Sequence, residues 1–183
     1  MSATTDGRRL RGIQRRAKIV EATLTVVERD GVAGVTHRTV AAEAGVPPGS
    51  VTYHFATLED LLIAALTSAV DDYAKQLDEL SAAGNDPLQG LARLIAETNG
   101  AGRRRALAER ELTLLAARRP ALQNAAGRWR GLVADIAAQW SSDPMAGDAL
   151  VGVSDAICAR ILLGDDTMTA EHIHEHLIHA VRS

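Results

Sequence analysis

The chain has 183 residues, 46% of them hydrophobic, and a formal net charge of −3. This length and apolar content allow a substantial core and exclude a disordered protein, while the single Cys158 excludes an internal disulfide. The longest apolar run spans only residues 61–66 and no signal-peptide pattern opens the chain, so we expect a cytoplasmic protein that makes no membrane contact.

The distribution of helix-forming residues predicts an all-α fold of about nine helices. Alanine and leucine abound, and no stretch alternates apolar and polar residues over strand length. We expect three parts: a flexible basic arm at 1–11, a helix-turn-helix domain at 12–56, and a helical ligand-binding and dimerisation domain at 57–183. The arm carries Arg8, Arg9 and Arg11, which could reach a minor groove or phosphates, although a solvated terminus is the alternative.

Residues 36–55 read as two short helices joined by a tight turn. Thr36 can cap the first helix, and Gly45 tolerates the left-handed conformation that ends it. Pro47 and Pro48 suit the cap and first position of the second helix, in which Val51 and Phe55 share the inward face. A short glycine-containing turn between two helices is the pattern of a helix-turn-helix motif.

The outward face of this helical pair carries groups that can bond DNA. Ser and Thr hydroxyls bond base edges or phosphates, a Tyr hydroxyl bonds phosphate, and an arginine in the first turn of the leading helix can bond guanine or phosphate. An ordinary hairpin with a solvated face is the alternative. The candidate DNA-binding residues are Arg38, Thr39, Gly49, Ser50, Thr52, Tyr53 and His54.

Charge is distributed unevenly along the chain. Residues 1–55 hold eight Lys/Arg and five Asp/Glu, a net of +3, whereas residues 56–183 have a net of −6. A basic segment beside a helix-turn-helix pattern favours nucleic acid as the partner, despite the negative total.

The first third of the chain also resembles a known family. The residues that carry the likeness are Gly31, Val35, Thr36, Val40, Ala41, Ala44, Gly45, Val46, Gly49, Ser50, Tyr53, His54, Phe55, Glu59 and Leu61. Over about residues 12–66 they resemble the N-terminal signature of the TetR family of transcriptional regulators. The resemblance implies an all-helical homodimer that binds operator DNA and is released from it by a small-molecule effector. Thr52 and Leu58 depart from the tyrosine and the phosphate-contacting lysine that the family often has there.

The body begins with a capping box, Thr57 with Asp60, which predicts a long helix over residues 58–80. Residues 81–87 form a breaker cluster. Further helices are predicted over residues 88–99, 103–118, 121–140, 145–163 and 169–182.

Polar residues on apolar helix faces are the candidate ligand contacts. A carboxylate within an apolar stripe is costly unless it is paired, so Glu111 could meet a cationic ligand or an internal arginine. Trp129 could line a cavity or be plain core. The full candidate set for the ligand is Thr98, Asn99, Glu111, Trp129 and Asp155.

The last helix carries several histidines, and His172, His176 and His179 have helical spacing that a zinc site could use. No further ligand is evident, so we predict no metal and no cofactor, and we expect a polar rim on a packing helix. A pH-sensitive interface is the alternative, and Cys158 could be core or a redox sensor.

The final two helices are predicted to make the dimer contact through a seven-residue-type apolar stripe, with intrachain packing as the alternative. The stripe and its continuation comprise Leu150, Val153, Ile157, Ile161, Ile173 and Leu177. In such a dimer, the two helix-turn-helix domains would bind two half-sites of a near-palindromic operator.

The sequence therefore predicts a dimeric DNA-binding regulator, a repressor released by a small molecule. A redox, metal or protein signal could replace the ligand. The rival class is a helical small-molecule-binding protein or enzyme, but no nucleophile-base pair or phosphate loop supports catalysis, so we predict no enzyme.

Overall fold

The computed structural model describes residues 3–82, 84 and 86–182, and within these ranges it contains only helices and turns. The N-terminal part comprises α1 (Ala3–Asp30), a 3-10 turn (Val32–Gly34), α2 (His37–Ala44), α3 (Pro48–His54) and α4 (Leu58–Ala82). The remainder comprises α5 (Pro87–Ala96), a 3-10 turn (Glu97–Asn99), α6 (Arg103–Ala116), α7 (Pro120–Ala137), α8 (Pro144–Leu162) and α9 (Ala170–Arg182). The all-α prediction is confirmed.

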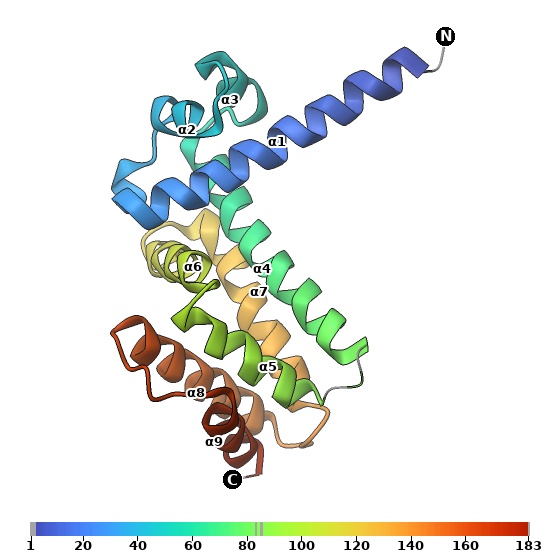
Figure 1. Cartoon of the computed structure of the whole chain (residues 1–183), viewed down its shortest axis with the longest axis vertical. Coiled ribbons are helices and arrows are strands. Elements are labelled where there is room, and N and C mark those ends of the chain that lie inside the picture. The colour runs from blue at the N-terminus through green and yellow to red at the C-terminus, as the bar shows by residue number, and fades with distance from the viewer. Residues whose placement is uncertain (1–2, 83, 85, 183) are drawn as a thin grey trace.

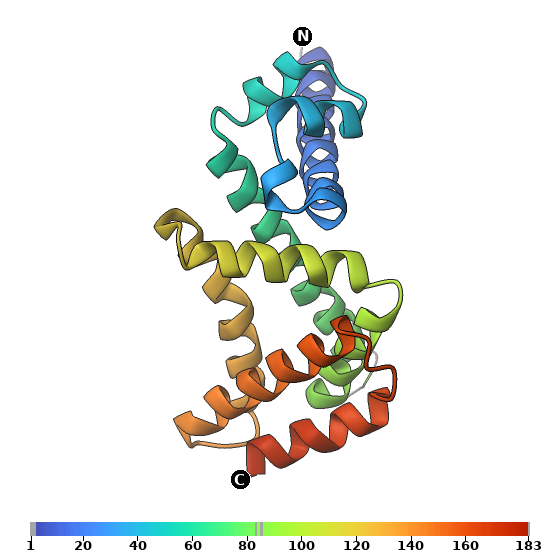
Figure 2. The same cartoon turned by 90° about the vertical axis from the view of Figure 1, so that its left-hand side faces the viewer.

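The helices form an elongated molecule with different elements at its two ends. Figure 1 shows α1, α2 and α3 at one end, which we call the head, and α8 and α9 at the other. α4 runs from the head into the rest of the molecule. Figure 2 shows α6 crossing the molecule directly beneath the head, between it and α8. Among the described residues, every helix is too short or too polar to cross a bilayer.

Local capping fixes the helix boundaries in the head. The Thr36 side chain accepts a hydrogen bond from the Thr39 backbone N–H, and Thr39 Oγ1 accepts one from the Thr36 N–H. Gly45 adopts φ 60° and ψ 42°, the left-handed conformation predicted for the end of α2. The Asp60 N–H donates to Thr57 Oγ1 at 3.0 Å, as expected of a cap for α4.

Two apolar clusters make up the core. The first joins buried residues of α1, α2 and α3 to Leu61 of α4, Leu112 of α6 and Leu122 of α7. The second lies among the far part of α4 and helices α5, α7, α8 and α9. The head therefore shares its core with α4, α6 and α7.

The structure corrects two expectations. α1 begins at Ala3, so residues 3–11 of the expected flexible arm are helical. Residues 1–2 and the side chain of Arg8 lie outside the described part. The residues predicted for dimerisation pack inside one chain, because those of α8 and α9 turn toward each other and toward α5. Val153 is half-buried. The buried residues are Leu150, Ile157, Ile161, Ile173 and Leu177.

Candidate nucleic-acid interface and internal pocket

The second helix of the pair, α3, presents its polar side to solvent. Val51 is fully buried and Phe55, which follows the helix, is 3% exposed, so both hold α3 against the core. Tyr53 is 85% exposed, and Gly49 and Thr52 are also exposed. Ser50 and His54 are half-buried at the edges. The exposed side of α3 therefore carries hydroxyl groups and no bulky aliphatic side chain, so its polar groups can approach the edges of base pairs or the phosphates.

The two candidates from α2 lie in different surroundings. Arg38 is exposed in the first turn of the helix, where its guanidinium is free to reach outward. Thr39 donates from Oγ1 to the Gly34 carbonyl at 2.8 Å and also caps α2. Its hydroxyl is thus engaged by the protein, and Arg38 is the stronger candidate for a DNA contact.

A small internal pocket lies among α4, α5, α6, α7 and α8. Its cavity volume is about 30 Å³, which corresponds to one water molecule and not to a drug-sized ligand. Helices must therefore separate before a larger molecule can enter. The residues that line the pocket are Tyr73, Leu94, Ile95, Thr98, Ala106, Glu109, Arg110, Trp129, Ser154, Asp155 and Cys158.

Aromatic rings and hydroxyl groups share the pocket wall. The ring centroids of Tyr73 and Trp129 lie 5.2 Å apart. Ser154 is 2% exposed, and its Oγ has no hydrogen-bond partner in the described structure. A buried hydroxyl without a partner is uncommon, so Ser154 offers a free donor and acceptor to a bound molecule.

The two carboxylates of the pocket differ in their partners. Asp155 accepts a hydrogen bond from Arg130 Nη2 at 3.0 Å and lies 3.8 Å from Arg110 Nη2. Glu109 accepts only the Thr113 hydroxyl, at 2.7 Å, among the contacts of the described residues. Burial is the main cause that raises the pKa of Glu109. Glu109 is therefore the carboxylate that a cation would stabilise most.

The predicted ligand residues divide between the pocket and other places. Thr98, Trp129 and Asp155 line the pocket, whereas Asn99 is absent from its wall. Glu111 lies outside the pocket, and its carboxylate accepts a hydrogen bond from the Val32 backbone N–H in the turn after α1.

Sequence reasoning missed the polar pocket residues Tyr73, Glu109, Arg110 and Ser154. The sequence placed Glu111 within an apolar stripe of α6, but Leu114, three residues further on, is 70% exposed, and the buried positions of this helix include Ala106 and Leu112. The spacing from Ala106 to Glu109 and Arg110, three and four residues, is the signal that could have identified the pocket face.

Cys158 and the histidines of α9 were the candidates for a redox, metal or pH signal. Burial raises the pKa of the Cys158 thiol, and Arg110 opposes this effect, so a thiolate is disfavoured. His174 Nε2 lies 3.3 Å from Asp86 Oδ2. In the ranges 3–82, 84 and 86–182, no three His, Cys, Asp or Glu side chains are grouped so that they could hold a metal ion. His172, His176 and His179 stay unassigned.

Comparison with protein families identifies the chain. Residues 84–183, more than half of the sequence, match the family model described as tetracyclin repressor-like, C-terminal domain. The chain belongs to the TetR family. Residues 19–65 match a second model, that of bacterial regulatory proteins of the tetR family, which includes α2 and α3. The resemblance inferred from the first third of the sequence is confirmed.

Solved structures extend the TetR likeness over most of the chain. The multidrug binding protein EbrR, complexed with ethidium, is 43% identical, with a TM-score of 0.75 over 91% of this chain and 97% of EbrR. A TetR-family member from Streptomyces coelicolor A3 is 43% identical, with a TM-score of 0.79 over 91% of this chain and 97% of its own.

A curated relative is the transcriptional repressor KstR of Mycolicibacterium smegmatis, 30% identical over 100 residues. The aligned region is 55% of this chain and 49% of KstR, so the match spans about half the length of that repressor.

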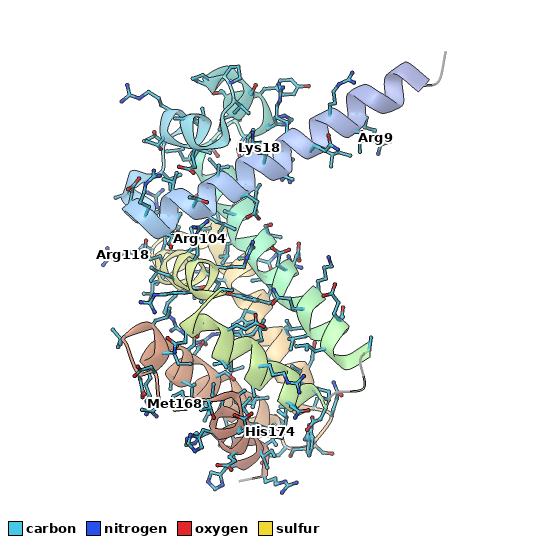
Figure 3. The ribbon with its side chains drawn as sticks, in the orientation of Figure 1. Arg9, Lys18, Arg104, Arg118, Met168 and His174 are labelled. Atoms are coloured by element: carbon cyan, nitrogen blue, oxygen red, sulfur yellow. The ribbon has the colours of Figure 1, made fainter. Side chains whose placement is uncertain are left out.

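In this TetR-family chain, α6 contacts both the pocket and the head. Glu111 Oε2 accepts a hydrogen bond from the Val32 backbone N–H at 2.9 Å. Arg104 Nε lies 2.8 Å from Glu28 Oε2 of α1, and Figure 3 shows Arg104 where α6 passes α1. We call these two contacts the α6–head contacts. Glu109, on the same helix, faces the pocket, so one rigid element connects the two regions.

Proposed function

We propose that the chain is a dimeric DNA-binding repressor that leaves its operator when an aromatic organic cation enters the internal pocket. The observation that carries this proposal is Glu109, a carboxylate held beside two aromatic rings with a single hydroxyl as its hydrogen-bond partner among the described residues. α3 and Arg38 supply the DNA-contacting surface.

The chemistry of the pocket favours a flat cation as the ligand. Arg110 and Arg130 pair with Asp155. Burial keeps the pKa of Glu109 raised and outweighs both arginines, which lower it but do not lie within salt-bridge distance of it in the described structure. Tyr73 and Trp129 could hold a cation by its interaction with their ring faces. EbrR, the 43% identical relative, has been solved with ethidium, malachite green and proflavin, and this supports cationic dyes as ligands here.

Release of DNA follows from the size of the pocket. A cavity of about 30 Å³ must expand roughly tenfold to enclose a drug-sized molecule. Expansion displaces α6, which carries Glu109 and the residues of the α6–head contacts. The ligand then favours a head orientation that fits the operator less well, because it binds the expanded state only.

The dimer is proposed to form through the outer face of α8. Met145 and Leu163, at the two ends of this face, are 74% and 89% exposed. Between them, Ala149, Gly152 and Ala156 are exposed and small, so a second copy of α8 can approach closely. Two heads in such a dimer would meet two half-sites of DNA.

The proposal is tested by selecting bound duplexes from random DNA and then adding ligand. We expect malachite green to release the selected operator, as measured by fluorescence anisotropy, and Arg38→Ala to weaken its binding by roughly 1–3 kcal/mol. Leucomalachite green, which has the same carbon skeleton without the positive charge, is the matched control and should leave the complex intact. Equal release by both compounds would exclude a cation-specific pocket.

A further inference from the structure

The N-terminal part of α1 extends beyond the rest of the head. Figure 1 shows it projecting past α2 and α3, and Figure 2 also places it at the end of the molecule remote from α8 and α9. Ile19 is the first buried residue of α1 among those whose side chains are described. Leu10 and Ile13 are 56% and 57% exposed. This helical segment therefore packs little against its own chain, and an isolated helix of that length is only marginally stable in water.

Positive charge is concentrated in this projecting segment. Residues 7–20 contain no Asp or Glu, and Arg9, Arg11, Arg15 and Arg16 are exposed. Arg16 lies over the Phe55 ring at 4.9 Å, but none of these four arginines forms a salt bridge within the described ranges. Figure 3 shows Arg9 on this part of α1. Cations toward the N-terminal end of a helix are disfavoured by its dipole, so intrachain electrostatics do not explain the arrangement.

A groove separates this segment from α3. It has a volume of about 660 Å³ and is lined by Arg11, Gly12, Arg15, Pro47, Gly49, Ser50, Tyr53 and His54. A Cβ atom added at Gly12 or Gly49 would meet nothing within 4 Å, so the space beside both glycines is open. Arg15 Nη1 lies 3.5 Å from Ser50 Oγ, across the groove. No carboxylate lines the groove, and its polar side chains can all donate hydrogen bonds.

We propose that the projecting part of α1 is a second DNA-binding element, which holds one sugar-phosphate strand of the operator in the groove beside α3. Arg11 and Arg15 bind the phosphates from the α1 side, while Ser50 and Tyr53 bind from the α3 side. The contact lies at the edge of the major-groove half-site and is independent of base sequence. This inference rests on the DNA-binding part of the proposed function and adds the element that grips the backbone.

The test uses the full chain with Arg11→Ala and Arg15→Ala combined, measured against the selected operator over a range of KCl concentrations. Each lost phosphate contact lowers the steepness of log K against log salt by about 0.9, so a dimer that loses four contacts should show a decrease of about 3 to 4. The order of preference among operator sequences should stay unchanged. Hydroxyl-radical protection should disappear from the strand that flanks each half-site.

Matched variants separate this contact from general charge effects. Arg11→Lys with Arg15→Lys keeps both charges and should retain most of the salt dependence. Arg118→Ala with Arg119→Ala removes two exposed arginines near the junction of α6 and α7, and should behave as the parent. Figure 3 shows Arg118 away from α3 and the projecting part of α1.

An unchanged salt dependence in the alanine variant, with the parent still bound to its operator, overturns the inference. A changed sequence preference also overturns it, because that result indicates base reading by α1. If the parent binds no duplex even at low salt, the proposed function itself fails, and the two failures are thereby distinguished. Alanine and arginine both favour helix, so circular dichroism should report equal helicity in variant and parent.

Discussion

Glu109 and Glu111 lie two residues apart on α6 and face different parts of the molecule, because residues at that spacing point to nearly opposite sides of a helix. Glu109 lines the pocket and bonds Thr113. Glu111 bonds the backbone of Val32. Two chemically identical side chains thus have different proposed roles, one in ligand recognition and one in connecting α6 to the head.

Glu109 should make cation binding depend on pH. Burial raises the pKa of Glu109 in the folded chain, and a cation favours the ionised carboxylate. The affinity for ethidium, a permanent cation, should therefore increase as the pH rises from the usual glutamate range through the raised pKa, and then level off. Glu109→Gln should remove this dependence and weaken binding at high pH by about 10- to 100-fold, as measured by isothermal titration calorimetry without DNA.

The same pKa shift has a consequence for stability. A carboxyl whose folded-state pKa is raised stabilises the fold fully below its unfolded pKa, and this contribution is lost as the pH rises through the folded pKa. Unliganded Glu109→Gln should thus lose less stability over that range than the parent does. Glu79→Gln, at an exposed position of α4, is the control for both measurements. A parent-like pH profile in Glu109→Gln would remove Glu109 from the proposed site.

At the scale of elements, α6 is the helix that joins the pocket to the head. Its contact with the turn after α1 is close: Gly31 has φ 71°, and a Cβ added there would lie 3.4 Å from Glu111 Oε2. The Arg104–Glu28 pair is more exposed and contributes little by itself. The hydrogen bond from Val32 to Glu111 is therefore the contact most able to transmit a displacement of α6.

Glu111→Ala should weaken the coupling between ligand and DNA without weakening ligand binding. The substitution leaves the Val32 N–H without its partner, at a cost of about 1–3 kcal/mol in unfolding free energy. The affinity for ethidium in the absence of DNA should stay unchanged, while the effect of malachite green on operator affinity decreases. Because coupling is reciprocal, the effect of operator on ligand affinity should decrease by the same factor.

Leu114→Ala is the control on the same helix, because that side chain is 70% exposed and lines neither the pocket nor the α6–head contacts. If Glu111→Ala responded to malachite green with the parent's full loss of operator affinity, another route must connect the pocket to the head.

At the scale of the whole molecule, the two ends of the chain have different electrostatic character. Residues 1–55 carry a net charge of +3 and residues 56–183 a net charge of −6. The head is therefore attracted to DNA while the rest is repelled, which favours an orientation with α3 toward the duplex. The proposed α8 face lies at the opposite end, where a second copy can bind without covering the heads.

Ala156→Glu should convert the proposed dimer to a monomer. The substitution places a carboxylate in the middle of the exposed small-residue face of α8, and an unpaired charge buried at an interface costs about 3–5 kcal/mol. Light scattering should report a monomer, and operator affinity should fall at least 100-fold. Ala121→Glu, at an exposed position near the start of α7, is the control. If Ala156→Glu remained dimeric, the outer face of α8 would be excluded as the dimer interface.

The sequence by itself determined the features that depend on neighbouring residues. The Thr36 cap, the left-handed Gly45 and the Thr57–Asp60 capping box were all readable from local patterns, because caps and turns are set within four or five residues. The same short-range patterns predicted the body helices, to within a few residues at their ends.

The tertiary structure decided which face of each helix is buried, and hence where the candidate sites lie. α8 is apolar or small around much of its circumference, so its spacing could not show that Leu150 and Ile157 face the core while Gly152 and Ala156 face outward. Likewise, spacing on α6 could not choose between Glu109 and Glu111. Burial depends on which distant helix covers a face, and that information comes only from packing between elements far apart in the chain.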